Sequence, residues 1–370
     1  EGPTVDGIHI GSQYGLLAFV TGRVVHGLLV GGPFVLGALY GVWAGHRLGK
    51  PTATAMGAMG WSVTALLGLL VIAIALFVAR PATTPPIVGP DGETLPGSVA
   101  ELVTVRIGGR DQAMLIRGRR VDNPVLLYLA GGPGGTDIGA IRADGTLEQD
   151  FVVAVWDQRG AGKSYSALDP TETLTLDQTV ADTVEITNYL RDRFDEDKIY
   201  VVGNSWGATL GVLAVQRHPE LFYAYVGIGQ MVSQRATDVM FWEDTLAWAD
   251  RTGNAGLAET LRANGPPPYE NLLDYEPALM HEHEWNDYPE LDLDNEMPSI
   301  LFVPEYTWMD RINGFRGFLD TFSALYPQLQ GIDFRVDVPR LAVPVYMVMG
   351  EHEARGRAVP ADEWFEVLQA

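Results

Sequence analysis

A serine between two glycines, placed where a strand gives way to a helix, is the most telling pattern in this 370-residue sequence. The pentapeptide Gly-Asn-Ser-Trp-Gly at 203–207 follows the apolar run 199–202 and precedes the small and apolar residues 208–215. Glycine permits the tight turns and close backbone approaches that such a junction needs. The pattern predicts a strand, a sharp turn and a helix in succession, with Ser205 lifted clear of the sheet.

From Val99 onward, short apolar strands alternate with helical patterns. The predicted strands lie at Glu101–Ile107, Gln112–Ile116, Val125–Ala130, Phe151–Trp156, 199–202, Tyr223–Ile228 and Val343–Met349, and a helix is predicted over Leu176–Phe194. Such alternation is typical of an α/β fold whose mostly parallel sheet carries helices on both faces. Residues from about 233 to 339 interrupt the alternation, and we interpret them as a helical cap inserted into an α/β domain that spans 99–370.

Residues 1–80 have the composition of a membrane region. Trp61–Ala79 holds no charged residue and is long enough to cross a bilayer, with a buried globular helix as the alternative. A second span over Val24–Ala44 would place Arg23 at its end, where a long side chain can reach the interface. We expect a transmembrane helical hairpin in the lipid bilayer, followed by a Pro- and Gly-rich linker at 81–98.

The distribution of basic residues gives a weak prediction of how this region is oriented in the membrane. His46, Arg47 and Lys50 lie in the short loop between the two spans, which favours a cytoplasmic loop and an extracytoplasmic α/β domain. Arg23 and Arg80 lie on the opposite side and nearly cancel that bias. We therefore expect localisation at a membrane, with the folded domain outside the cytoplasm.

The overall charge and the absence of cysteine exclude several classes of partner. A net charge of −22 argues against nucleic acid, because too few basic residues are present to neutralise phosphates. Without cysteine, disulfides and cysteine metal sites are impossible. His281 and His283 alternate with acidic residues, but we favour an exposed acidic turn over a metal site there. The sequence predicts no cofactor and no metal.

Ser205 is the predicted nucleophile. A serine hydroxyl needs a base to remove its proton and donors to stabilise the oxyanion that its attack creates. A glycine-rich segment, Gly131–Gly135 with Pro133 at its centre, follows the buried strand at 125–130. We expect its backbone to supply one donor while the N–H of Trp206 supplies the other. A plain glycine turn is the alternative for either segment.

Three motifs in this order resemble those of the α/β-hydrolase superfamily, and more narrowly its proline-iminopeptidase-like branch, the serine peptidase family S33. They are the glycine-rich segment, the run Asp-Gln-Arg-Gly-Ala-Gly-Lys-Ser at 157–164 and the serine pentapeptide. The resemblance covers about 99–370 and implies an oxyanion hole formed by Gly132 and Trp206. The family usually has a histidine before the two glycines, where this chain has Ala130.

The run at 157–164 does not fit a phosphate-binding loop. Asp157 stands where the Walker pattern needs a glycine. We interpret Asp157 and Arg159 instead as a structural ion pair or turn network beside the site.

The sequence contains a candidate acid for a catalytic triad but no evident base. By the family pattern the acid is Glu353, just past the strand at 343–349, with Glu351 or a solvated acidic turn as alternatives. No histidine follows Glu353. His218 is expected to pack or cap at the end of the helix after Ser205. We expect the catalytic histidine beyond residue 370, because 364–370 looks like an unfinished helix and the chain looks truncated there.

The predicted cap is strongly acidic. Between Arg262 and Arg311 it holds twelve acidic residues and no Lys or Arg, with Tyr and Trp interleaved. A mouth of carboxylates and aromatic rings would attract a cation such as the free amino group of a peptide, with a solvated acidic face as the alternative. The sequence therefore predicts a membrane-anchored serine hydrolase, an aminopeptidase that acts on small peptides through an acyl-enzyme. A carboxylester hydrolase acting on an ester substrate, or a catalytically silent binding or scaffold protein if no histidine follows residue 370, are the alternatives.

Overall fold

The computed structural model describes residues 79–369 except Pro170, 172–173, Asn271 and 287–299, together with a few isolated residues before 79 (Trp43, Arg47, Thr64, 67–70 and Ile72). The expected transmembrane hairpin therefore lies almost wholly outside the described residues. Within the described part, no helix combines the length and apolar character that a bilayer crossing requires. The chain divides into two units between Pro81 and Ala82, and the second unit contains the fold that follows.

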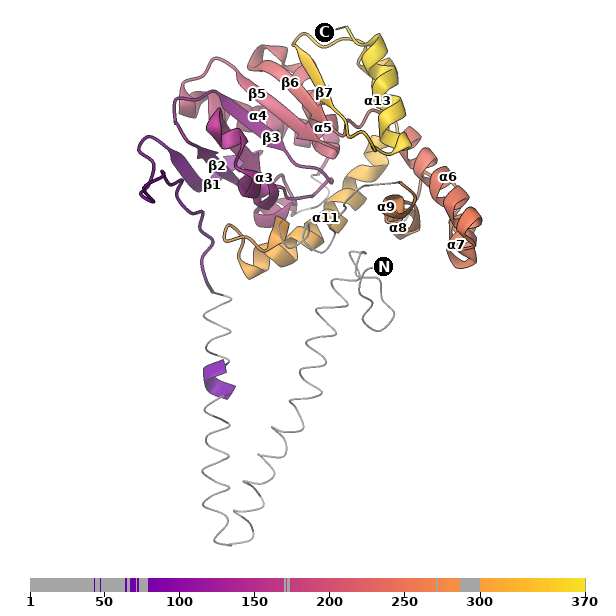
Figure 1. Cartoon of the computed structure of the whole chain (residues 1–370), viewed down its shortest axis with the longest axis horizontal. Helices are drawn as coiled ribbons and strands as arrows, with labels where there is room; N and C mark the ends of the chain where they lie inside the picture. The colour runs from indigo at the N-terminus through magenta and orange to yellow at the C-terminus, as the bar shows by residue number, and fades with distance from the viewer. Residues whose placement is uncertain are drawn as a thin grey trace. The chain divides into compact units, whose positions relative to one another are not determined.

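A seven-stranded sheet lies at the centre of the second unit (Figure 1). Its strands are β1 (Val99–Ile107), β2 (Arg110–Gly118), β3 (Val125–Leu129), β4 (Val152–Trp156), β5 (Ile199–Asn204), β6 (Phe222–Ile228) and β7 (Val345–Val348), in the order β1-β2-β4-β3-β5-β6-β7. β2 runs antiparallel to both β1 and β4, and every other neighbouring pair is parallel. The predicted mostly parallel sheet is confirmed.

Helices cover both faces of the sheet. β3 and β4 are buried along their whole length, as expected for continuous apolar strands enclosed on two sides. One face packs against α4 (Leu176–Phe194), α5 (Trp206–Arg217) and α13 (Arg355–Val367). The other face packs against α3 (Ile138–Asp144) and residues 301–306. The alternation of side chains along each strand thus feeds two separate apolar layers.

The amphipathic pattern at 176–194 forms α4 with the predicted bounds. Thr175 caps its start by accepting a hydrogen bond from the N–H of Gln178, and Asp195 ends it in the left-handed conformation. Val180, Ile186 and Leu190 are buried against the sheet. The helix therefore buries the face that its sequence period indicates.

The insertion between β6 and β7 is helical in its described residues. It contains α6 (Gln234–Thr252), α7 (Ala255–Asn264), α8 (Leu272–Leu279), α9 (Glu282–Trp285), α11 (Trp308–Leu329) and α12 (Phe334–Asp337). In Figure 1, α6 to α9 and α11 gather at the end of the sheet toward which the parallel strands point. In α/β sheets of this kind, ligands bind at the carboxyl ends of the parallel strands.

The last residues do not continue as a helix. α13 ends at Val367, and Gln369 forms a parallel bridge with Arg340. The N–H of Gln369 donates to the carbonyl of Pro339 (3.0 Å), and its own carbonyl accepts from Leu341 (2.9 Å). The expectation of an unfinished helix at 364–370 is wrong, because backbone pairing with a distant segment replaces the helical hydrogen bonds there.

Candidate active site

Ser205 occupies a sharp turn between β5 and α5. Its backbone lies at φ 52° and ψ −115°, a conformation that costs a residue with a side chain free energy. A Cβ atom on Gly203 would lie 2.3 Å from the carbonyl oxygen of Gly207, and one on Gly207 would lie 2.0 Å from that of Leu129. The N–H of Ser205 donates to the carbonyl of Ile228 (2.9 Å), which fixes the turn to β6. The two glycines are therefore required for the turn, and Ser205 remains half-exposed.

The glycine-rich loop lies beside this serine. A Cβ atom on Gly131 would be 3.5 Å from the Cβ of Ser205. Gly132 has φ 127°. It lies in a turn that is closed by a hydrogen bond from the N–H of Gly135 to the carbonyl of Gly131 (3.1 Å). Trp206 is the first residue of α5, where backbone N–H groups lack an intrahelical acceptor. The structure thus brings together the segments that contain Gly132 and Trp206, and their role as oxyanion donors stays a prediction.

Gln158 connects the two segments, and its role was not predicted. The indole N–H of Trp206 donates to its side-chain oxygen (2.8 Å), and its side-chain nitrogen donates to the carbonyl of Ala130 (3.1 Å). All three residues are buried. Gln158 lies two residues past the end of β4, and this position alone does not reveal its contacts with Trp206 and Ala130.

Asp137, which was not predicted from the sequence, holds the glycine-rich loop at 131–135. Its carboxylate accepts from the N–H of Gly131 (3.4 Å) and from the side chains of Asn204 and Tyr128. Enclosure raises the pKa of this carboxyl, and the three hydrogen bonds oppose that rise. Asp137 therefore ties the loop at 131–135 to the residue that precedes the serine.

Asp157 and Arg159 do not pair with each other. Arg159 forms a buried, two-pronged ion pair with Asp182 of α4 (2.8 and 3.1 Å). Asp157 accepts from the N–H of Lys163 (2.9 Å) and from the hydroxyl of Tyr306 (2.8 Å). Burial raises the pKa of Asp157 to about 7, against the effect of these hydrogen bonds. The expected turn network is present, but the two residues belong to separate structural clusters.

Glu353 lies near the carboxyl end of β6. One of its oxygens is 3.6 Å from the position that a Cβ atom on Gly229 would take, and Asn204 Oδ1 is 3.9 Å from that same position. The other oxygen accepts from the Nε of Arg357 (2.5 Å). Glu351, the alternative acid, is exposed. The geometry therefore places Glu353, rather than Glu351, on the side of the sheet end that Asn204 and Ser205 share.

The histidines whose side chains the structure describes lie elsewhere. His218 ends α5 and contacts Glu220 (3.1 Å), as expected for a residue at the end of that helix. His281 in the cap contacts the carbonyl of Pro277 (2.8 Å), and His352 is exposed. None of these three hydrogen-bonds to Ser205. Nor do the described residues contain a group of three or more His, Asp or Glu side chains arranged to hold a metal ion.

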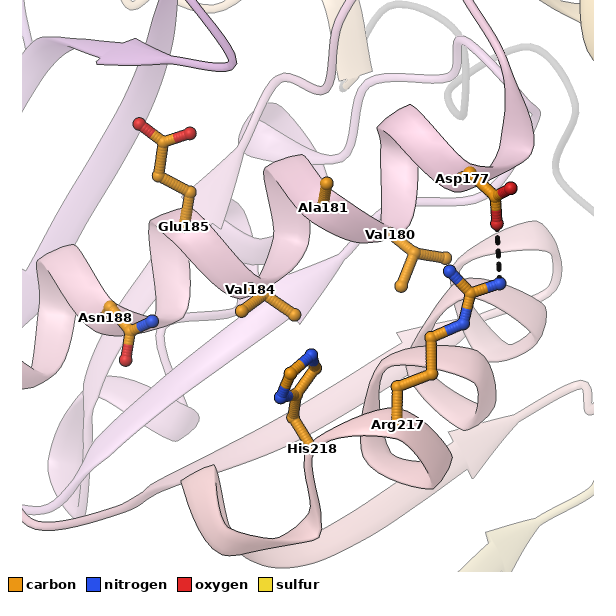
Figure 2. Close-up of a pocket in the computed structure, with 8 residues that line it drawn as sticks. All are labelled: Asp177, Val180, Ala181, Val184, Glu185, Asn188, Arg217 and His218. Atoms are coloured by element: carbon orange, nitrogen blue, oxygen red, sulfur yellow. Dashed lines mark hydrogen bonds and ion pairs between the residues drawn. The ribbon is translucent and has the colours of Figure 1, made fainter.

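Figure 2 shows an open surface pocket of about 350 Å³ between α4 and α5. Val180 and Val184 form its apolar wall, His218 faces them, and Asp177 pairs with Arg217 at one side (2.7 Å). His218 and Arg217 stand at the end of α5, roughly 18 Å of helix away from Ser205. This pocket is therefore separate from the candidate active site.

Basic side chains from outside the acidic stretch neutralise part of the cap. Of its acids, Glu282 pairs with Arg357, Glu305 with Arg142 (3.0 Å) and Asp310 with Lys163 (2.8 Å). The acidic residues at 287–296 lie outside the described part of the chain. The described cap is thus less negative than its sequence indicates.

Several cap aromatics are buried rather than placed at a mouth. Tyr269 and Tyr275 stack with each other and join Phe322 and Tyr326 in the core of the cap. Tyr326 donates a hydrogen bond to the buried Asp238 (2.8 Å). Burial raises the pKa of that carboxyl, and hydrogen bonds from Tyr275 and Tyr326 oppose the rise. The expectation of an opening lined by tyrosines of the acidic stretch is therefore wrong for Tyr269 and Tyr275, because both are buried in the core of the cap.

Comparison with known proteins agrees with this geometry. The profile of the family described as alpha/beta hydrolase fold matches residues 124–353. The probable aminopeptidase YbaC of Bacillus subtilis (strain 168) is 28% identical over 288 residues, which cover 74% of this chain and 87% of that protein. The proline iminopeptidase of Neisseria gonorrhoeae is 34% identical over 201 residues, 50% of this chain and 58% of that protein.

A solved structure supports the fold alone. The proline iminopeptidase-related protein of Thermus thermophilus superposes with a TM-score of 0.52 at 19% identity, covering 73% of this chain and 88% of that one. With the matched profile, the sheet order and the serine turn in agreement, the chain belongs to the α/β-hydrolase fold family.

Proposed function

We propose that this chain is a serine hydrolase, an aminopeptidase of proline-iminopeptidase type that releases the N-terminal residue of a small peptide. The observation that carries the proposal is the placement of Ser205 on its strained turn beside the glycine-rich loop, where a Cβ atom built on Gly131 would lie 3.5 Å from the Cβ of Ser205. Relatives with aminopeptidase and proline iminopeptidase names support the substrate class.

In the proposed reaction, the Oγ of Ser205 attacks the carbonyl carbon of the first peptide bond. The backbone N–H groups of Gly132 and Trp206 stabilise the oxyanion, and Glu353 orients a histidine that carries the proton to the departing amine. Water then hydrolyses the acyl-enzyme, which frees the N-terminal residue and restores the serine. In this proposal Ser205 is the nucleophile, the loop at 131–135 contributes to the oxyanion hole and Glu353 is the acid, and the histidine is not assigned to a described residue.

A carboxylester hydrolase uses the same nucleophile, so only substrate turnover separates it from an aminopeptidase. A catalytically silent binding protein is the second candidate. The observation that favours it is the absence of a hydrogen bond between Ser205 and any histidine whose side chain the structure describes.

The proposal includes a membrane anchor. The charge-free run Trp61–Ala79 and the apolar run Val24–Ala44 support a hairpin in the bilayer, with the hydrolase domain on the extracytoplasmic side. Fractionation of cells, followed by protease digestion of intact and opened membranes, tests both statements. Recovery of the whole chain in the soluble fraction would contradict the anchor.

The enzymatic proposal is tested on the full-length protein with two substrate series. We expect turnover of prolyl and other aminoacyl arylamides, little turnover of short acyl p-nitrophenyl esters, and covalent labelling of Ser205 by a fluorophosphonate. Ser205→Ala is the control and should abolish labelling and turnover together. Preference for esters would support the carboxylester hydrolase, and absence of both turnover and labelling would support the silent protein.

A further inference from the structure

Among the described residues, hydrogen bonds reach only one oxygen of the Glu353 carboxylate. Its Oε1 accepts from the Nε of Arg357 (2.5 Å) and from the N–H of Ala354 (3.1 Å). Its Oε2 is directed toward Gly229 at the end of β6, 3.6 Å from where a Cβ atom would stand. The side chains of Glu353 and Arg357 are 14% and 18% exposed, so this pair is shielded from water. One oxygen is thereby fixed, and the other is presented to the sheet end that carries Ser205.

The guanidinium of Arg357 reaches the cap as well. It forms a two-pronged ion pair with Glu282 of α9, one contact of which is 3.1 Å. It also lies over the ring of Phe241 in α6, 5.1 Å from the ring centre. Burial alone would lower the pKa of Arg357, but the carboxylates of Glu282 and Glu353 raise it. One cation is therefore shared between the candidate acid and two cap helices.

The backbone around Arg357 is packed against the same cap helix. Thr237 of α6 donates a hydrogen bond to the carbonyl of Gly356 (2.7 Å). A Cβ atom on Gly356 would lie 2.7 Å from the ring of Phe241. The start of α13 is therefore packed closely against α6, one residue away from Arg357.

We propose that Arg357 is a positioning residue that fixes the Glu353 carboxylate and makes its placement depend on the docking of α9 through Glu282. This inference rests on the proposed function, in which Glu353 orients the catalytic base. Correct docking of the cap then aligns the acid, and a displaced α9 withdraws the cation from it.

Arg355 offers a matched control two residues away. It also joins α13 to the cap, through Glu243 (3.0 Å) and Asp244 (3.0 Å) of α6. Its side chain is exposed and has no contact with Glu353 among the interactions of the described residues. Arg355→Met removes a cap ion pair of the same kind without touching the acid.

The experiment compares Arg357→Met, Arg357→Lys, Glu282→Gln and Arg355→Met in the full chain. Crystal structures of the variants give the position of the Glu353 carboxylate relative to Gly229, and arylamide kinetics give kcat and KM. Loss of the contact with Arg357 should move that carboxylate away from Gly229 in Arg357→Met. It should lower kcat roughly 10- to 100-fold at nearly constant KM, because the acid is displaced.

The remaining variants separate charge, geometry and stability. Arg357→Lys keeps the charge but not the planar fork, so it should restore the carboxylate position and kcat only in part. Glu282→Gln should lower kcat less than Arg357→Met does, and Arg355→Met should match the wild type in both readouts. Should Arg357→Met fail to fold, Arg357→Lys decides: a lowered kcat at constant KM supports the assignment, and wild-type kinetics overturn it.

An unmoved Glu353 carboxylate in Arg357→Met, with kcat equal to that of Arg355→Met, overturns the inference. The crystal structure needs no turnover. A wild-type protein without peptidase activity would therefore contradict the proposed function, while the position of the Glu353 carboxylate still tests the role of Arg357.

Discussion

The indole N–H of Trp206 donates a 2.8 Å hydrogen bond to the side-chain oxygen of Gln158, and through Gln158 it is linked to the carbonyl of Ala130. We expect Gln158→Leu to leave a buried N–H and a buried carbonyl without partners, at a cost of about 2–4 kcal/mol in the free energy of unfolding. The glycine-rich loop would also lose its connection to the serine turn, so kcat should fall. Urea unfolding and arylamide kinetics measure the two effects.

Gln216→Leu is the control for that variant. Gln216 is an exposed glutamine that donates to the carbonyl of Asp337 (3.0 Å), so its loss should have little effect on stability or kcat. Equal effects of the two substitutions would show that the Trp206–Gln158 contact has no special importance.

Asp157 should make the stability of the protein depend on pH. Burial raises its pKa from the ordinary 3.8 to about 7, so the folded chain binds this proton more tightly than the unfolded chain does. The stabilisation is complete below about pH 4 and is lost as the pH rises through about 7. Asp157→Asn removes this titrating group. Between pH 4 and pH 8 the free energy of unfolding of the wild type should therefore fall, relative to that of Asp157→Asn, by on the order of 4 kcal/mol. Chemical denaturation at several pH values measures the difference.

Tyr306→Phe tests the same carboxyl from its partner. The Tyr306 hydroxyl hydrogen-bonds to both oxygens of Asp157 (2.8 and 3.1 Å) and opposes the rise in its pKa. Without that hydroxyl the pKa of Asp157 should rise further. The protein should therefore lose the stabilisation from protonated Asp157 at a higher pH than the wild type does. Parallel pH profiles for wild type and Asp157→Asn would contradict the account.

Gly317→Ala should separate the cap helix α11 from the sheet end. A Cβ atom on Gly317 would lie 2.1 Å from the carbonyl oxygen of Gly160, and that of Gly134 would lie 2.4 Å from the carbonyl of Gly317. Overpacking of this kind costs about 1–3 kcal/mol, which exceeds the roughly 1 kcal/mol that alanine gains over glycine inside a helix. We expect a lower melting temperature and, because Gly134 of the glycine-rich loop lies against Gly317, a lower kcat.

Gly314→Ala provides the comparison one turn earlier on α11. Its Cβ would meet only the end of the Leu301 side chain, at 2.9 Å, and that side chain can rotate. The gain in helix propensity should then dominate, so this variant is expected to be neutral or stabilised. A Gly317→Ala protein as stable and active as Gly314→Ala would contradict the predicted backbone contact.

Arg159→Met should be strongly destabilising. It leaves the carboxylate of Asp182 buried without its cation, although Gln112 and Gln178 still donate to it. Removal of one partner from a buried pair costs about 3–5 kcal/mol. Arg106→Met breaks the exposed pair with Asp111 and should cost no more than about 1 kcal/mol in the same thermal unfolding assay. Similar losses for the two variants would contradict the importance of burial.

Elements with a strong local pattern could be predicted from the sequence. The continuous apolar strands β3 and β4 and the amphipathic α4 are present where residue periodicity indicates. β2 is longer than predicted because residues such as Arg110 and Gly118 pair with β1, in register with Ile107 and Val99. The ends of a strand depend on its partner, and that information is not contained in the strand's own residues.

The residues of the candidate site divide in the same way, into those with a local sequence pattern and those that depend on distant partners. Ser205 and the glycine-rich loop could be predicted, because glycines at fixed spacing report a backbone geometry. Gln158 and Arg357 could not, because each acts through side chains 48 to 75 positions away along the chain. The charge of the described cap could not be predicted for the same reason, since Arg142 and Lys163 pair with Glu305 and Asp310 from distant segments.

The helix that follows Ser205 is buried from Trp206 through Val215. Ser205 therefore stands on a part of the molecule where opening requires disruption of the core itself. A rearrangement around the candidate site should then take place in the cap, beside a serine that stays still. In hydrogen exchange, amides of this helix should open only with global unfolding, whereas those of α6 to α9 should exchange through smaller, local openings.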